Sequence, residues 1–241
     1  MIEVYWFEQA DTDVPLENDW LSSEEIRRLN GLHFAKRRAD WRLGRWTGKC
    51  AVAHCLNLYD DFTAFAKIEI RASDTGAPEA FLSGRDAGVS ISLSHSSSRA
   101  ACAVTHSQVT LGCDLEKVEP RSRSFVRDYF TADEQHLIAS STFSERGRMA
   151  TLLWSAKESA LKVLRTGLRL DTRCVVVSLS DVSFGPGQWH PLEVRCLSGD
   201  HFYGWWQHRE GFLRTMVSSI QADPPVCREI PSFHERALPR A

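Results

Sequence analysis

The sequence has almost no excess charge of either sign, and this absence excludes one class of protein. Lys and Arg total 29 and Asp and Glu total 31, which gives a net charge of −2 over 241 residues. A protein that binds polyanions through net charge alone needs a clear positive excess. Hydrophobic residues make up 43% and charged residues 25%. These fractions are ordinary for a globular protein and exclude a disordered, collagen-like or coiled-coil chain.

Cysteine motifs and long apolar runs are absent as well. The seven cysteines are widely spaced and form no Cys-x-x-Cys pair, so neither a zinc ribbon nor a thioredoxin motif is expected. Most lie in apolar runs, where a free cysteine behaves as a small hydrophobe, as in a reducing cytosol. No window holds 18 consecutive apolar residues, and the first residues lack the basic and apolar regions of a secretory signal. We therefore expect a cytoplasmic protein without a membrane span.

The remaining pattern indicates a chain of mixed helices and strands. Helical patterns occur at 19–32, 35–56, 123–129, 133–140 and 148–164. Strand patterns occur at 1–8, 66–71, 89–94, 100–104, 109–116, 174–180, 192–197, 202–208 and 212–220. The connections between the three strands of 89–116 are short, so these strands are expected to form a β-meander.

Helices followed by strands, twice over, predict an α+β fold of two similar α/β halves. No residue-level repeat is evident between the halves. We place the N-terminal half at 1–107, the C-terminal half at 108–222 and an irregular, proline-containing tail at 223–241.

Basic residues gather between Arg27 and Lys49, where Asp40 is the single acidic residue. Arg38, Arg42 and Arg45 are spaced so that they share one face of a helix. Like charges on one face repel, and an arginine fork suits phosphate, so a phosphate-rich ligand would compensate them. The alternative is a solvated helix face.

Two acidic residues lie within one predicted strand in the middle of the chain, and a histidine lies at the end of another. Asp114 and Glu116 alternate with apolar residues and therefore point to the same face of a strand. Adjacent carboxylates suit a hard cation such as Mg²⁺, although an exposed acidic edge remains the alternative. His95, in Ser94-His95-Ser96, stands where a strand exits into a polar loop. It is either a ligand contact or a satisfied structural residue.

The helical pattern at 148–164 carries a third acidic residue. Trp154, Glu158 and Lys162 lie on one face, separate from the apolar stripe. Glu158 would complete the magnesium site or act as a base. The alternative is a surface ion pair with Lys162, worth about 0.3–0.5 kcal/mol.

Taken in order, these motifs resemble the 4′-phosphopantetheinyl transferase family, of the surfactin-synthetase-activator (Sfp-like) type. The resemblance covers about residues 30 to 180. The motifs that carry it are Gly76-Ala77-Pro78, Ser92-Leu93-Ser94-His95-Ser96, Gly112-Cys113-Asp114-Leu115-Glu116, Phe130-Thr131-Ala132-Asp133-Glu134, and Trp154-Ser155-Ala156-Lys157-Glu158-Ser159 with Lys162 and Gly167-Leu168.

The resemblance implies a pseudo-duplicated fold with the active site at the interface of the two halves. It also implies a Mg²⁺-dependent enzyme that moves the 4′-phosphopantetheine arm of coenzyme A to a serine of an apo acyl or peptidyl carrier protein. Adenosine 3′,5′-bisphosphate would be released. The expected partners are coenzyme A and the carrier protein, without nucleic acid or membrane, and a chain of this type is expected to be monomeric.

The resemblance also assigns roles to residues. Asp114, Glu116 and Glu158 would bind Mg²⁺, and Glu158 and Lys162 would be catalytic. Contacts to coenzyme A would come from Arg42, Arg45, Gly76, Pro78, Ser94, His95, Lys157 and Lys162. Which basic residues of 36–49 hold phosphate is left open. Ala77 departs from many relatives, which carry Lys at this position to help hold the nucleotide.

Two alternatives belong to other classes of function. The first is a non-catalytic module that binds coenzyme A or a carrier protein. The second is nucleic-acid binding through residues 27–49, which predicts an affinity that falls steeply with salt. Within the transferase hypothesis, the sequence leaves open the carrier and the pathway, whether fatty acid, polyketide, nonribosomal peptide or lysine biosynthesis.

Overall fold

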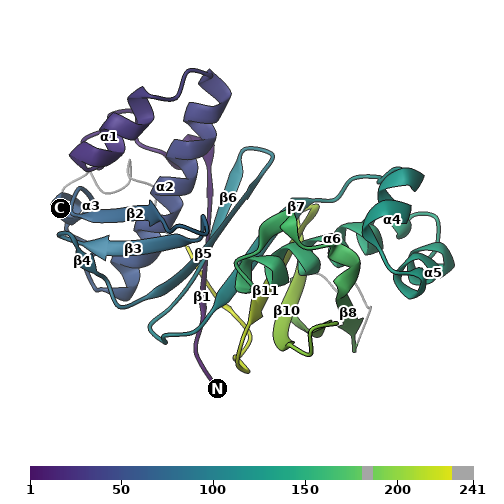
Figure 1. Cartoon of the computed structure of the whole chain (residues 1–241). Helices are drawn as coiled ribbons and strands as arrows, with labels where there is room; N and C mark the ends of the chain where they lie inside the picture. Colours follow the sequence, from purple (N-terminus) through teal and green to yellow (C-terminus); the bar gives the residue numbers. More distant parts are fainter. Residues whose placement is uncertain (181–186, 230–241) are drawn as a thin grey trace. The chain divides into compact units, whose positions relative to one another are not determined.

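A computed structural model describes residues 1–180 and 187–229, which form mixed helices and strands in two compact units (Figure 1). Unit 1 consists of residues 1–4 and 109–225, and unit 2 of residues 5–108 and 226–241. The chain therefore passes from unit 2 to unit 1 after Gln108. Among the helices of the described residues, none has both the length and the apolar character that crossing a membrane requires.

Unit 2 contains two sheets and a long helix. Its elements are β1 (Tyr5–Ala10), α1 (Ser23–Asn30), α2 (Ala35–Cys55), α3 (Phe62–Phe65), β2 (Ile68–Ala72), β3 (Pro78–Leu82), β4 (Arg85–Asp86), β5 (Ser90–Ser96), β6 (Arg99–Thr105) and β12 (Val226–Arg228), with a 3₁₀ turn at Asp11–Asp13. One sheet has the order β12-β1-β6-β5, and the other has the order β2-β3-β4. Helix α2 packs against β1 and β6 of the larger sheet (Figure 1).

The C-terminal part of α2 forms the core of unit 2 because its residues are apolar or small. Trp46 and Cys50 are buried and belong to one hydrophobic cluster with Phe65 of α3 and Cys102 of β6. The ring of Trp46 stacks on that of Phe65 at 5.2 Å between centroids. This packing fixes α2 and leaves its first turns, which carry the basic residues, toward solvent.

Unit 1 is one antiparallel sheet covered by helix α6. Its elements are β7 (Leu111–Lys117), α4 (Arg123–Tyr129), α5 (Ala132–Ser140), α6 (Arg146–Val163), β8 (Val175–Leu179), β9 (His190–Cys196), β10 (His201–Arg209) and β11 (Phe212–Ser218), with 3₁₀ turns at Gly167–Arg169 and Thr172–Cys174. The strand order is β7-β11-β10-β9-β8. Helix α6 lies against β7 and β11.

A very close approach joins α6 to the sheet. A Cβ atom on Gly112 of β7 would lie 1.9 Å from the backbone oxygen of Ser159, so only glycine fits there. The hydroxyl of Thr215 on β11 lies 2.9 Å from the hydroxyl of Ser155 and 2.7 Å from that of Ser159. All three hydroxyl-bearing residues are fully buried. Helix α6 is therefore held at a fixed height over the strand that carries Asp114 and Glu116.

The expected β-meander is wrong for its third strand. β5 and β6 form the expected antiparallel hairpin, but β7 pairs with β11 in the sheet of unit 1. A short connection permits pairing between neighbours but does not require it, and here the chain changes unit between β6 and β7.

Several elements carry too little hydrophobic pattern to be predicted. Strands β3 and β4 and helix α3 are short, and β3 is bounded by turn glycines with positive φ at Gly76 and Gly84. The segment 223–241, expected to be irregular, contains β12, which pairs in parallel with β1. Residues 230–241 of that segment lie outside the described residues.

Candidate functional site

Asp114, Glu116 and Glu158 lie near enough in unit 1 for their charges to act on one another. β7 presents Asp114 and Glu116 to α6, and α6 presents the face formed by Trp154, Glu158 and Lys162 to β7, as their contacts show. Asp114 is only 5% exposed. The acidic strand is therefore covered by α6, and the alternative of a solvated edge does not apply to it.

Cationic and N–H groups hold two of these carboxylates. The ammonium of Lys162 lies 3.0 Å from Oδ1 of Asp114 and donates to the carbonyl of Cys113 at 2.6 Å. Glu116 accepts hydrogen bonds at 3.2 Å from both Arg121 and the indole N–H of Trp154. The guanidinium of Arg121, which the sequence motifs do not include, also stacks over the Phe125 ring at 5.1 Å.

Burial and mutual repulsion shift the protonation of this cluster. Burial, and next the charge of Asp114, raise the pKa of Glu158 to about 6. The same two causes raise the pKa of Glu116 above its ordinary value. Burial works to lower the pKa of Lys162, but Asp114 outweighs it and the pKa is raised, so the ammonium stays charged. The cluster thus contains more negative charge than its own cations neutralise.

The donor set suits a hard divalent cation. Oε1 of Glu158 is buried and accepts no hydrogen bond from the described residues, and a buried polar atom of this kind is costly without a partner. Carboxylate oxygens are the ligands that Mg²⁺ prefers. Within residues 1–180 and 187–229, however, no three His, Cys, Asp or Glu side chains are already grouped to hold a metal ion. The carboxylate oxygens are therefore of the type that Mg²⁺ binds. In this structure, Lys162 contacts Asp114 and Arg121 contacts Glu116, two of the carboxylates that would be ligands.

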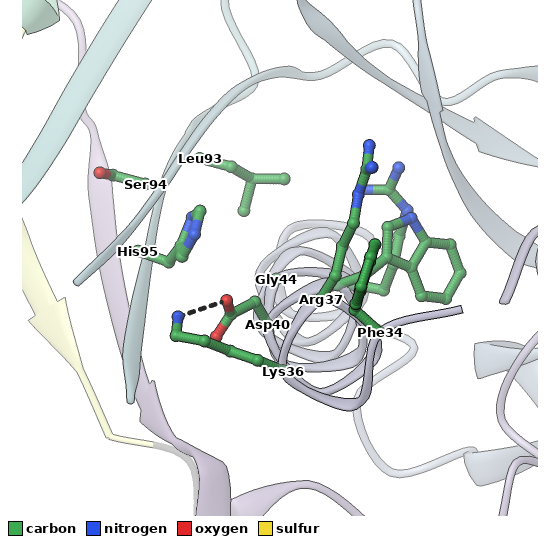
Figure 2. Close-up of a pocket in the computed structure, with 10 residues that line it drawn as sticks. Phe34, Lys36, Arg37, Asp40, Gly44, Leu93, Ser94 and His95 are labelled. Carbon is green, nitrogen blue, oxygen red and sulfur yellow. Dashed lines mark hydrogen bonds and ion pairs between the residues drawn. The ribbon is translucent and has the colours of Figure 1, made fainter. Parts of the chain in front are cut away.

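A cavity of about 620 Å³ lies in unit 2 between the start of α2 and the end of β5. Its walls combine cationic groups with flat apolar ones. It is lined by Phe34, Lys36, Arg37, Asp40, Trp41, Gly44, Arg45, Leu93, Ser94 and His95. Figure 2 shows Lys36, Arg37, Asp40 and Gly44 on the helix, opposite Leu93, Ser94 and His95 on the strand. The guanidinium of Arg45 lies 4.9 Å from the centroid of the Trp41 ring.

This cavity contains three of the residues expected to contact coenzyme A, namely Arg45, Ser94 and His95. Burial lowers the pKa of Arg45, which indicates a cation held partly out of water. The cavity also contains Trp41 and Phe34, which the sequence motifs do not include.

Backbone carbonyls hold Arg42, whose expected contact with coenzyme A stays a prediction. Its guanidinium donates to the backbone carbonyls of Pro15, Leu16 and Glu17. Arg38 likewise donates to the carbonyls of Leu29 and Leu32, at 2.7 and 3.3 Å. Backbone oxygens thus offset the repulsion between Arg38 and Arg42 on this helix face.

Gly76 and Pro78 lie at a turn rather than in the cavity. The turn joins β2 to β3, with Gly76 at φ +88° and Pro78 as the first residue of β3. Neither residue, nor Ala77 between them, is among those that line the cavity. Their assignment to coenzyme A stays a prediction.

Lys157 is completely buried, and this differs from the expected contact with coenzyme A. Its ammonium pairs with Glu134 at 2.9 Å and donates to the carbonyls of Thr172 and Val175. Three partners use the three N–H donors of an ammonium group. The structure therefore gives Lys157 a place in the core, behind the helix face that carries Glu158.

Known proteins match the part of the chain that contains the carboxylates. Residues 110–216 match the family model of the 4′-phosphopantetheinyl transferase superfamily. The matched segment lies within unit 1 and contains Asp114, Glu116, Glu158 and Lys162. The finding supports the superfamily that the sequence motifs resemble.

A curated relative supports the same superfamily. The chain is 26% identical over 150 residues to the 4′-phosphopantetheinyl transferase HetI of Nostoc sp., and the match covers 61% of each chain. The chain thus spans about three fifths of the length of this relative. Among solved structures, it is similar to the holo-[acyl-carrier-protein] synthase of Thermotoga maritima at 21% identity, over 54% of this chain and 76% of that one, with a TM-score of 0.33. A likeness at this level does not establish a shared fold.

Proposed function

We propose that the protein is a 4′-phosphopantetheinyl transferase that uses coenzyme A to modify a serine of an apo carrier protein. The observation that carries the proposal is the carboxylate cluster of unit 1. Glu158, with a pKa of about 6 and a buried oxygen that lacks a partner among the described residues, faces Asp114 within the segment that matches the superfamily. A carboxylate with this pKa is suited to accept a proton near neutral pH.

The reaction is a displacement at phosphorus. The serine oxygen forms a bond to the β-phosphorus of coenzyme A, the bond to the bridging oxygen breaks, and adenosine 3′,5′-bisphosphate leaves. Glu158 takes the serine proton, directly or through water. Lys162, beside Asp114, supplies positive charge to the phosphates. Mg²⁺, held by Asp114, Glu116 and Glu158, would neutralise further charge on the pyrophosphate.

Unit 2 supplies the groups that bind the nucleotide end of coenzyme A. The cavity offers the guanidinium of Arg45 and the side chain of His95 for phosphate. Ser94 lines the cavity through its place on the strand, and its hydroxyl is directed away from α2 (Figure 2). Trp41 and Phe34 offer flat apolar surface in the same cavity.

The finer features of the family resemblance belong to the proposal too. These are the Sfp-like type, the pseudo-duplicated arrangement with the active site at the interface of its halves, the dependence on Mg²⁺ and the monomeric state. A cytoplasmic location remains a prediction from the sequence.

The test is transfer to a panel of apo carrier proteins in the presence of coenzyme A and Mg²⁺, followed by intact mass. We expect at least one carrier to gain the mass of the phosphopantetheine arm. Asp114→Asn and Glu158→Gln should each abolish the gain while circular dichroism shows a folded protein. Glu119→Gln is the matched control, because Glu119 is an exposed carboxylate that pairs only loosely with Lys117 at 3.7 Å.

Two results would contradict the proposal. No mass gain across fatty-acid, polyketide and peptide carriers would argue against transfer. Retained transfer in both Asp114→Asn and Glu158→Gln would remove the roles given to these carboxylates. Tight binding of coenzyme A without turnover would instead favour the non-catalytic module, a reading consistent with the present pairing of Lys162 and Asp114.

A further inference from the structure

Among the residues that the structure describes, each unit contains one lysine whose side chain is fully buried. Lys49 lies on α2 of unit 2 and Lys157 on α6 of unit 1, and both side chains are 0% exposed. Burial lowers the pKa of both, and a glutamate opposes this lowering in each case. A buried charge is strongly unfavourable unless it is paired and hydrogen-bonded. Both lysines therefore need partners within the core.

In unit 1, Lys157 connects α6 to the start of α5 and to the segment before β8. Its ammonium contacts Glu134 and donates to the carbonyl of Thr172 at 2.8 Å and to that of Val175. Glu134 closes the capping box that begins α5 and accepts the backbone N–H of Val177 at 3.2 Å. One glutamate thus joins a helix start, a strand and α6.

In unit 2, Lys49 makes the same kind of connection for α2. Its ammonium lies 2.5 Å from Glu25 and donates to the carbonyls of Trp20 and Phe65 at 2.9 and 2.8 Å. Glu25 closes the capping box that begins α1 and accepts the backbone N–H of Ile70 at 3.2 Å. Here too one glutamate joins a helix start, a strand and the long helix.

The two arrangements share the buried lysine, the glutamate of the capping box and the strand N–H that this glutamate accepts, whereas the second carbonyl partner of the lysine differs, being Trp20 in unit 2 and Val175 in unit 1. Each lysine stands one helical turn after a tryptophan, Trp46 or Trp154. Each of these indole rings meets another aromatic ring edge to face, at 5.2 Å for Trp20 with Trp46 and 5.1 Å for Tyr129 with Trp154. The residue after the lysine differs, because unit 2 has Cys50 where unit 1 has Glu158. The sequence shows no evident repeat because these matched positions are few and widely separated.

We propose that Lys157 is a positioning residue for Glu158, and that Lys49 positions the wall of the cavity in the same way. Successive residues of a helix point about 100° apart, so a helix held by Lys157 on one side presents Glu158 in a fixed direction. On the sheet side, Gly112 and the hydroxyl of Thr215 set the height of α6. The proposal rests on the proposed function for the role of Glu158.

The test removes each ion pair while keeping its capping box. Lys157→Met with Glu134→Gln does so in unit 1, and Lys49→Met with Glu25→Gln is the matched variant in unit 2, since glutamine also closes a capping box. For the unit 1 variant we expect Mn²⁺ affinity, measured by calorimetry, and kcat to fall about 10-fold or more, as when groups that orient metal ligands are lost. The KM for coenzyme A should stay unchanged. The unit 2 variant should show the reverse, a raised KM with unchanged Mn²⁺ affinity.

Unchanged Mn²⁺ affinity and kcat in the folded unit 1 variant would overturn the proposal. Equal losses of affinity for Mn²⁺ and for coenzyme A in both variants would overturn it too. The two lysine–glutamate pairs would then contribute to stability alone. If the unit 1 double variant does not fold, Glu134→Asp keeps the charge but shortens its reach. This variant should bind Mn²⁺ more weakly than the wild type. Wild-type affinity for Mn²⁺ would contradict the positioning role of Lys157. If the wild type transfers no phosphopantetheine, the proposed function fails, while the Mn²⁺ titrations still decide the role of Lys157.

Discussion

Glu158 is held in an environment that favours its neutral form. Burial and the charge of Asp114 raise its pKa to about 6, and one of its oxygens has no hydrogen-bond partner among the described residues. Such a side chain costs folding free energy in its ionised state. A carboxylate whose pKa is shifted by burial and by a neighbouring charge is a common sign of a functional site.

Replacing Glu158 should therefore stabilise the metal-free protein at neutral pH. Between the ordinary pKa of 4.5 and about 6, the folded state binds the proton more readily than the unfolded chain, so stability falls as the pH rises through this interval. Glu158→Gln removes this loss. In thermal melts with a chelator, we expect the variant to melt higher than the wild type at pH 7.5, with a smaller difference at pH 5. A lower melting temperature at pH 7.5 would contradict this account.

At the residue scale, sequence spacing found the right face but not every role. The separation of Trp154, Glu158 and Lys162 correctly placed them on one face, because helical periodicity depends on the backbone alone. Arg42 and Lys157 were assigned to coenzyme A, yet backbone carbonyls and Glu134 hold them. Such partners are distant in sequence, so composition and spacing carry no signal for them. Arg121 escaped notice for the same reason, since its contact with Glu116 depends on how the chain folds back.

At the scale of elements, the helix-to-sheet distance decides the geometry of the carboxylates. The backbone of α6 touches β7 at Gly112, so the side chains of Glu158 and Lys162 reach those of the strand. The sequence predicted most of the strands and helices, since apolar periodicity defines them. It missed the pairing of β7 with β11, because pairing depends on contacts far along the chain.

Two glycine substitutions should have opposite effects on stability. Gly112→Ala would place a methyl group 1.9 Å from the oxygen of Ser159, and we expect a loss of about 3 kcal/mol or more, at the top of the range for overpacking. Gly44 lies within α2 with nothing near its missing Cβ, so Gly44→Ala should gain up to about 1 kcal/mol from helix propensity. Urea unfolding measures both changes.

Gly44→Ala carries a second expectation, because Gly44 lines the cavity. The added methyl group should weaken coenzyme A binding in calorimetry while stability rises. A destabilised Gly44→Ala variant would contradict the open space around Gly44. A Gly112→Ala variant as stable as the wild type would contradict the close contact between Gly112 and Ser159.

At the scale of the whole molecule, the two units have separate hydrophobic cores, and the groups proposed to bind ligands are divided between them. The carboxylates lie in unit 1, with its core around α6, and the cavity lies in unit 2, with its core around α2. Each ligand is therefore expected to stabilise the unit that holds its groups.

Hydrogen exchange with single ligands should separate these effects. Mn²⁺ alone should slow exchange in β7 and α6, and coenzyme A alone should slow it in the first turns of α2 and in β5. Asp114→Asn should remove the first effect and leave the second. Protection by Mn²⁺ in α2, or none anywhere, would contradict the division of roles between the units.

The assignment of chain segments to the units has a consequence for dissection of the protein. Neither unit is one continuous stretch, since residues 1–4 belong with 109–225 and β12 returns to pair with β1. A cut after Gln108 would therefore not release two intact modules. The N-terminal fragment would lack the strand that covers β1 and would expose an unpaired edge, a site of aggregation. A version of unit 2 made on its own needs residues 226–228 joined by a linker, as in a circular permutant.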